Sequence, residues 1–353
     1  MKKIAFIVQQ PKEYSPSQRF RVELWEDILL ENGYEFETFP FLDVPTIKIL
    51  YQQGHLLQKV WGVFKGFSRR ICSIPKLVKY DYLFIQREMS PIGPPIFEYI
   101  LAKWFKKKLI FDFDDAIWIT DKKHNPLMGF VKNYQKIPKI IKWSYKVAAG
   151  NDVLLNYAKT YNPNSFKIPT CVDTIHYHNQ LKNQHTNKVV IGWTGSHSTM
   201  VYLDTFMPVY ERLLKKYDLE LIIISNKAPT YQLPSITYIP WNAKTEIEDL
   251  LRFNIGVMPL VNDLWSEGKC GFKLIQYLAL GIPAVASPVG INTKIIEPKN
   301  GYLCTTDEEW YQALETLIVN EQLRKNMGEA GRQKIQSEFC IHAIKSDFLQ
   351  LFT

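Results

Sequence analysis

The sequence predicts an α/β protein with parallel sheets, arranged as two domains. Short apolar runs alternate with segments of helical period along the whole chain, which is typical of parallel-sheet folds. The length of 353 residues suggests two domains at roughly 150 residues each. A polar stretch without periodicity, residues 178–188, separates two such series and predicts a linker.

In the first series, Ile4–Val8 is predicted as a strand, because this apolar run is too short for a signal peptide and turns polar at Gln9. Gly33 marks the end of the first predicted helix. The further predicted strands are Tyr34–Phe39, Tyr82–Gln86, Leu109–Phe113, Val147–Ala149 and Phe166–Ile168, and the predicted helices are Gln18–Gly33 and Asp152–Tyr161.

The second series starts directly after the linker and closes with two long helices. Its predicted strands are Val189–Trp193, Glu220–Ile224, Thr237–Ile239, Ile255–Pro259, Ala284–Ser287 and Gly301–Cys304. Its predicted helices are Leu203–Tyr217, Glu246–Phe253, Phe272–Leu280, Glu308–Asn320 and Glu321–Glu338.

The predicted domains are residues 1–177 and 189–338, followed by a C-terminal helix, 339–353, that packs back on the first domain. Two α/β halves joined by a linker would leave a cleft between them. Ligands of such sheets bind at the carboxyl ends of the strands, facing that cleft.

The amino-acid composition excludes several classes of protein. Apolar residues make up 46% and charged residues 22%, so disorder, collagen and coiled coil are excluded for the whole chain. The 5 cysteines are scattered without CxxC spacing, which argues against a disulfide framework and a structural zinc site and favours a reducing compartment. Because no run of about 18 apolar residues occurs, we expect a cytoplasmic protein.

Positive charge is concentrated in the first half. Residues 1–176 hold 26 Lys and Arg against 17 Asp and Glu, whereas the whole chain has a net charge of +8. Three basic, aromatic clusters lie between Asp43 and Asp81, over Lys122–Lys146 and over Lys103–Lys108. They suit an anionic membrane surface, on the inner face of the cytoplasmic membrane, and solvated helix faces are the alternative. No nucleic-acid motif accompanies the charge.

The chemically most informative stretch runs from Ser266 to Ser287. It follows a predicted strand, and a glycine-containing loop opens a helix there. Free backbone N–H groups at such a helix start bind phosphate, and Lys269 and Lys273 add positive charge at the same end. The alternative is that Gly271 only turns the chain and that the lysines are solvated.

This stretch resembles the group 1 retaining glycosyltransferases of the GT-B fold. In that family a strand ending in Pro precedes a Glu-containing glycine loop, a helix and a strand of the form G-[IL]-P-x-V-A-S. The chain has Gly-Ile-Pro-Ala-Val-Ala-Ser at 281–287 and Asn-Gly-Tyr-Leu at 300–303. The resemblance implies two facing Rossmann-like domains and transfer of a sugar from a nucleotide-sugar donor, with retention and without a metal or other cofactor. The chain resembles in particular a bacterial subgroup that acts in surface-polysaccharide and glycan biosynthesis.

The resemblance also implies donor-binding residues. The family's glutamate pair falls here on Gly268 and Gln276, with Glu267 one place off, and we assign Glu267 a catalytic role. The family's Arg and Lys after the first strand of the second domain are absent. Trp241 is a candidate for stacking on the nucleotide base, with core packing as the alternative. The predicted donor residues are Gly195, Ser196, Trp241, Lys269, Gly271, Phe272, Lys273 and Gln276.

In the first half, Arg19 and Arg21 lie between the first strand and the first helix, where they suit a phosphate or carboxylate of the acceptor. Salt bridges to Glu23 or Glu26 are the alternative.

Asp114 and Asp115 end another strand. The resemblance puts Asp114 where the family has a His near the reacting sugar, so both aspartates are assigned to the reaction site. An N-cap is the alternative for Asp115, and His124 is a further candidate for acceptor contact.

Together these residues predict an enzyme that moves a sugar to a glycan or lipid-linked acceptor. The alternatives are a sugar-nucleotide epimerase of the same architecture and a non-catalytic sugar-nucleotide-binding protein. A nucleotide-dependent dehydrogenase is disfavoured, because no G-x-G-x-x-G follows the first strand.

Overall fold

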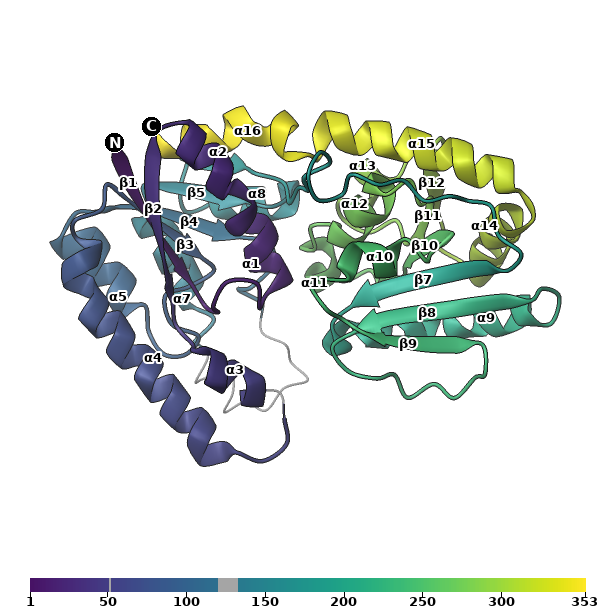
Figure 1. Ribbon diagram of the computed structural model, residues 1–353. Helices are drawn as coiled ribbons and strands as arrows, with labels where there is room; N and C mark the ends of the chain where they lie inside the picture. The colour runs from purple at the N-terminus through teal and green to yellow at the C-terminus, as the bar shows by residue number, and fades with distance from the viewer. Residues whose placement is uncertain (51, 120–132) are drawn as a thin grey trace. The chain divides into compact units, whose positions relative to one another are not determined.

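The computed structural model describes residues 1–50, 52–119 and 133–353 (Figure 1). The chain divides into two compact units. Unit 1 contains Met1–Thr170 and Ile344–Thr353, and unit 2 contains Cys171–Ala343.

Unit 1 is built on a six-stranded sheet with the order β2-β1-β3-β4-β5-β6. All pairs in it are parallel, as the sequence predicted. The central strands are apolar and fully buried, which explains why they appear in the sequence as continuous apolar runs. The strands are β1 Lys2–Val8, β2 Tyr34–Pro40, β3 Tyr82–Gln86, β4 Lys108–Phe113, β5 Lys146–Ala149 and β6 Ser165–Lys167.

The helix predicted at Gln18–Gly33 is interrupted. Val22 has φ −127° and ψ −62°, outside the helical region, and a 3₁₀ turn follows before the chain becomes helical again. Gly33 ends the second helical piece with φ +77°, as its sequence position predicted. The helical elements of unit 1 are α1 Pro16–Arg21, η1 Glu23–Trp25, α2 Glu26–Glu31, α3 Val44–Leu50, α4 Leu56–Leu77, α5 Ile96–Tyr99, η2 Ile100–Trp104, α7 Lys136–Trp143 and α8 Asp152–Lys159.

The last residues of the chain belong to unit 1. Helix α16, Ile341–Leu349, is followed by a 3₁₀ turn, η4 Gln350–Phe352. The Phe348 ring stacks on Trp25 with 4.0 Å between ring centroids, and Phe352 packs on Tyr82 and Phe84. Aromatic stacking of this kind fixes the chain end on the helices and strands of the N-terminal sheet.

Unit 2 has a second six-stranded parallel sheet, ordered β12-β11-β10-β7-β8-β9. Its strands are β7 Val189–Gly195, β8 Leu219–Ser225, β9 Ile236–Pro240, β10 Ile255–Met258, β11 Ala284–Ala286 and β12 Gly301–Leu303. Its helical elements are η3 His197–Thr205, α9 Met207–Leu214, α10 Glu246–Leu250, α11 Leu264–Glu267, α12 Phe272–Ala279, α13 Asn292–Ile295, α14 Asp307–Val319 and α15 Glu321–Glu338.

The segment predicted as a linker, residues 178–188, lies within unit 2. Lys182 donates its backbone N–H to Leu280 and its ammonium to the carbonyl of Leu251. The Gln184 side chain is buried, and its carbonyl oxygen accepts from Asn254 and Arg324. Lys182 and Gln184 therefore tie this segment to unit 2, while Asn179, Gln180, Asn183 and Asn187 are exposed to solvent.

Each sheet has one point where the strand order reverses. In unit 1 it lies between β1 and β3, and in unit 2 it lies between β7 and β10. At such a switch point the loops after the two strands run in opposite directions and leave room for a ligand at the carboxyl ends.

Candidate active site

The carboxyl ends of β3 and β4 carry a group of charged side chains that we call the carboxylate cluster: Arg87, Asp112, Asp114 and Asp115. Gln86 and Asp112 are register partners in the two strands, so the residues that follow them emerge side by side. Arg87 donates its backbone N–H to the Asp112 carbonyl oxygen at 2.7 Å. The cluster thus lies next to the switch point of the unit 1 sheet.

Asp114 is held by groups from two segments, α1 and the residue after β3. Ser17, near the start of α1, donates its hydroxyl to one carboxylate oxygen, and Arg87 Nη2 lies 3.1 Å from the other. Burial favours the neutral acid, but the Arg87 and Arg21 guanidinium groups and the Ser17 hydroxyl outweigh it and hold the pKa of Asp114 below its usual value. Asp114 is therefore an ionised hydrogen-bond acceptor at neutral pH.

Arg87 was not identified from the sequence, although it contacts both predicted aspartates. It forms ion pairs with Asp114 and Asp115, and these two charges raise the pKa of its guanidinium despite burial. Its φ of +69° is unusual for a residue with a side chain, and such backbone positions gather at functional sites. Its place directly after the predicted strand Tyr82–Gln86 is the signal that could have found it.

Arg21 is buried, with 2% of its side chain exposed, and is paired with Asp112. Its guanidinium contacts both carboxylate oxygens of Asp112 and also donates to the carbonyl of Ile168. The structure thus gives Arg21 an ion pair with Asp112, a partner that the sequence did not suggest. Burial raises the pKa of Asp112 to about 6, against the opposing effect of Arg21. These contacts tie α1 to the end of β4, and a contact of Arg21 with an acceptor stays a prediction.

Arg19 lies on the same short helix but is less buried than Arg21. Its guanidinium carbon is 5.2 Å from the centre of the Phe20 ring. Arg19 therefore keeps part of its surface accessible to solvent, and acceptor binding by this residue stays a prediction.

In unit 2, the predicted phosphate-binding residues gather at the switch point between β7 and β10; we call Gly195, Ser196, Lys269, Gly271, Phe272 and Lys273 the glycine–lysine cluster. Lys273 lies against the end of β7. A Cβ on Gly195 would be 2.9 Å from Lys273 Cε and 2.6 Å from the Trp193 ring, and the Lys273 ammonium lies 5.5 Å from the centre of that ring. The close approach requires glycine at position 195.

Gly271 is the N-cap of helix α12, with φ +66° and no room for a side chain. A Cβ there would lie 2.3 Å from Ile295. Lys269 precedes this helix start, and its ammonium lies 5.6 Å from the ring centres of both Tyr202 and Trp265. Two lysines thus flank a helix N-terminus whose first N–H groups lack helical acceptors, an arrangement suited to a diphosphate.

Gln276 follows one turn later on α12 and is 2% exposed. Its side-chain nitrogen is buried without a hydrogen-bond partner. An unpaired buried amide costs free energy, and a contact of this group with the donor stays a prediction.

Glu267 ends α11 and is half-buried. The backbone there lies against Gly290, because a Cβ on Gly290 would be 2.7 Å from the Glu267 carbonyl oxygen. Glu267 therefore sits where the loops after β10 and β11 meet. A role in the reaction stays a prediction.

Trp241 directly follows β9, two strands from β7 in the sheet. Its indole N–H donates to Glu246 at 2.9 Å, and the Tyr177 hydroxyl lies 3.2 Å from the other oxygen of the same carboxylate. This network fixes the orientation of a half-buried ring. Stacking of Trp241 on a nucleotide base stays a prediction.

No group of three or more His, Cys, Asp or Glu side chains that could hold a metal ion occurs in residues 1–50, 52–119 and 133–353. His124 lies outside the described residues. In the same described ranges, no helix is both long and apolar enough to cross a lipid bilayer.

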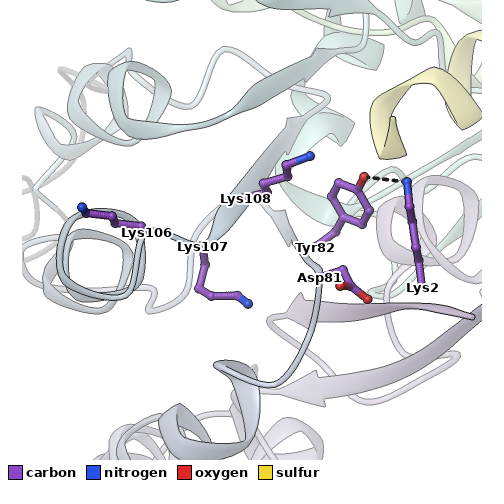
Figure 2. A pocket seen from close by; sticks show the side chains of 6 residues that line it. All are labelled: Lys2, Asp81, Tyr82, Lys106, Lys107 and Lys108. Atoms are coloured by element: carbon purple, nitrogen blue, oxygen red, sulfur yellow. Dashed lines mark hydrogen bonds between the residues drawn. The ribbon is translucent and has the colours of Figure 1, made fainter.

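A pocket of about 270 Å³ lies at the amino ends of the unit 1 strands, opposite the ends that carry the carboxylate cluster (Figure 2). Lys2, Tyr82 and Lys108, the residues that line it from β1, β3 and β4, stand at the amino ends of these strands. The Lys2 ammonium lies 3.3 Å from the Tyr82 hydroxyl. This pocket is therefore separate from the carboxylate cluster, which lies at the carboxyl ends.

Comparison with known proteins supports the resemblance. Residues 188–320 match the family described as "Glycosyl transferases group 1". Over 195 residues the chain is 22% identical to N-acetyl-alpha-D-glucosaminyl L-malate synthase of Bacillus anthracis. That alignment covers 49% of this chain and only 48% of the relative, about half its length.

Solved structures match over nearly the whole chain. Sucrose-phosphate synthase from Thermosynechococcus elongatus superposes with a TM-score of 0.72 at 12% identity, covering 100% of this chain and 98% of that one. Anabaena HepE in complex with UDP-glucose superposes with a TM-score of 0.67 at 12% identity, covering 99% of both chains. At identities this low, the superpositions establish the fold alone. They confirm the predicted GT-B class. The chain thus has the GT-B fold, and residues 188–320 within unit 2 match the group 1 glycosyltransferase family.

Proposed function

We propose that the chain transfers a sugar from a nucleoside-diphosphate sugar to a glycan or lipid-linked acceptor in polysaccharide or glycan assembly, with retention and without a metal. In this reaction the bond from the anomeric carbon to the diphosphate oxygen breaks, and a bond to an acceptor hydroxyl oxygen forms. The hydroxyl proton leaves to solvent. Negative charge accumulates on the departing diphosphate, so fixed positive charge there lowers the barrier.

The observation that carries the proposal is the position of Lys269 just before α12 and of Lys273 in its first turn, where Lys273 lies against Gly195 at the unit 2 switch point. Backbone N–H groups and two ammonium groups form a site for a diphosphate, and the unpaired Gln276 nitrogen is available to a neighbouring oxygen. In unit 1, the ionised Asp114 would accept a hydrogen bond from a sugar or acceptor hydroxyl.

The test is a thermal-shift screen against UDP, GDP, ADP, CMP and dTDP. UDP is the first choice, since HepE was solved with UDP-glucose. Ligand at about a hundred times its dissociation constant should stabilise the protein by about 2.7 kcal/mol. The shift should shrink in Lys273→Ala and persist in Lys325→Ala, a matched control on the exposed side of α15. No shift with any nucleotide would refute the donor site.

Turnover separates the proposed transferase from its two rivals. With the nucleotide sugar whose base gives the shift, a transferase releases nucleoside diphosphate faster when acceptor is added. An epimerase converts the donor sugar without acceptor, and a non-catalytic binding protein shows the thermal shift without any conversion. Unchanged rates in excess EDTA would agree with a metal-independent reaction.

A further inference from the structure

Helix α4, Leu56–Leu77, has its apolar side on the outside of unit 1. Six large apolar residues on it are 56% to 84% exposed. At 100° per residue they fall within an arc of roughly 140° on one side of the helix. They are Leu56, Leu57, Val60, Trp61, Phe64 and Ile71, and we call this arc the outer face of α4.

The opposite side of α4 packs on unit 1 through small residues and one buried arginine. A Cβ on Gly62 would lie 2.3 Å from Thr46, and one on Gly66 would lie 2.4 Å from Phe41, so the helix backbone is in close contact with these neighbours. Arg70 donates to the carbonyls of Val8, Phe39 and Met89 at 2.6–2.7 Å. The helix is therefore fixed in its rotation, and the outer face is set away from the core.

A helix on the surface of a protein in water normally shows its polar side to the solvent. On α4 the arrangement is reversed over the outer face, and Trp61 and Phe64 stack on each other there, with ring centroids 5.3 Å apart. A contiguous exposed apolar face of this kind marks an interaction site.

The charges around the outer face indicate the partner. Residues 44–80 contain 7 basic and no acidic residues. Lys59 and Lys65 border the outer face on its two sides, and among the described residues neither forms an ion pair with a carboxylate. The remaining charges of the helix are engaged, since Arg69 pairs with Asp43 and Lys76 with Glu37. Apolar rings between lysines that have no carboxylate partner match the interface of an anionic bilayer.

We propose that the outer face of α4 docks on an anionic lipid membrane, with Trp61 and Phe64 entering the interfacial region and Lys59 and Lys65 contacting lipid phosphates. This inference rests on the proposed function in one respect: docking would bring unit 1, with the carboxylate cluster, to a lipid-linked acceptor. The binding itself is a property of α4 and can be measured without donor or acceptor.

Cys72 gives a direct reporter, because it is exposed on α4 while the other four cysteines are buried. An environment-sensitive fluorophore on Cys72 should shift to the blue with vesicles of phosphatidylcholine containing about 30% phosphatidylglycerol, and less with phosphatidylcholine alone. Reversing the charge of both lysines, in Lys59→Glu/Lys65→Glu, should weaken binding to these anionic vesicles roughly tenfold or more. Raising the salt to about 0.5 M should weaken it as well.

The apolar part is tested by Trp61→Ser/Phe64→Ser, which should abolish vesicle binding, with Leu30→Ser as the matched control. Leu30 is 58% exposed on α2 of the same unit and should leave binding unchanged. Circular dichroism checks that each variant is folded. The proposal would be overturned if Trp61→Ser/Phe64→Ser bound vesicles as well as the wild type does. It would also be overturned if wild-type binding did not depend on lipid charge. A dimer that this variant dissociates, without vesicle binding, would assign the face to self-association instead.

The two proposals fail separately. Nucleotide-induced stabilisation without vesicle binding would refute membrane docking and leave the donor site intact. Vesicle binding without stabilisation by any nucleotide would refute the proposed function and leave docking intact.

Discussion

Arg87 Nη2 lies 3.1 Å from Asp114 Oδ1, at the carboxyl ends of the adjacent strands β3 and β4. The same nitrogen contacts Asp115, so one guanidinium holds two carboxylates together. Without it, two negative charges would face each other in a partly buried place. After burial, which raises the pKa of Asp114, Arg87 has the largest effect on it and, with Arg21 and Ser17, keeps Asp114 ionised.

In Arg87→Gln we expect the pKa of Asp114 to rise, because burial then acts with less opposition. The wild-type carboxylate has a lowered pKa, so the stability it contributes is present above its unfolded pKa and is lost as the pH falls through the lower folded value. In the variant, the acid limb of the profile of nucleoside-diphosphate release against pH should move to higher pH. Arg87→Lys should move it less, and an unchanged limb in Arg87→Gln would separate Asp114 from the reaction.

Arg21→Met should destabilise the protein by about 3–5 kcal/mol, because it leaves Asp112 buried without its partner. Urea unfolding measures the loss. Arg21→Met/Asp112→Asn should recover part of it, since the unpaired charge is removed as well. A stable Arg21→Met variant with weaker acceptor binding would instead assign Arg21 the acceptor role predicted from the sequence.

Gly195→Ala should weaken nucleotide binding by displacing Lys273 and should also lower stability. The added methyl group would meet the buried Trp193 ring and Lys273 Cε. Overpacking of this kind costs about 1–3 kcal/mol. Isothermal titration gives the affinity and urea unfolding the stability. If affinity is kept while stability falls, the contact with Lys273 has no part in the donor site.

Gln276→Leu should leave stability unchanged or slightly higher, because the amide nitrogen that it removes has no hydrogen-bond partner. It should weaken binding of the nucleotide sugar, for which that nitrogen is available. The thermal shifts of the wild type and of Gln276→Leu are compared with the nucleotide and with the nucleotide sugar. A loss seen only with the nucleotide sugar would show that Gln276 contacts the sugar part of the donor. Equal shifts in wild type and variant would exclude a donor contact.

Much of the fold could be predicted from local sequence. The strand Tyr82–Gln86 and the helix Glu321–Glu338 have the bounds that the sequence predicted. Apolar runs of buried parallel strands and capped helices are local signals, and Asn320 caps α15 by accepting from Leu323. The helix predicted at Gln18–Gly33 was wrong as a single element, because the break at Val22 has no glycine or proline to mark it.

In the candidate site, too, local motifs could be predicted from the sequence, whereas contacts between distant residues could not. Lys269, Gly271 and Lys273 were predicted because they lie within one short motif, and the structure brings Lys273 to Gly195 across the switch point. Arg87 was missed because its partners, Asp114 and Asp115, are 27 and 28 positions away in the chain. Arg21 looked like an anion-binding side chain, and only burial against Asp112 shows that its charge is already engaged.

By itself the sequence determined the α/β class and the parallel strands and located the motif that is predicted to bind phosphate, because periodicity, capping and glycine turns act between residues close in the chain. Only the tertiary structure decided which strands are neighbours, and with that which charges meet at their ends. It also decided that the apolar side of α4 faces outward, since two glycines and Arg70 on the other side pack on unit 1. Packing joins residues that are distant in the chain, and local patterns do not encode which of them meet.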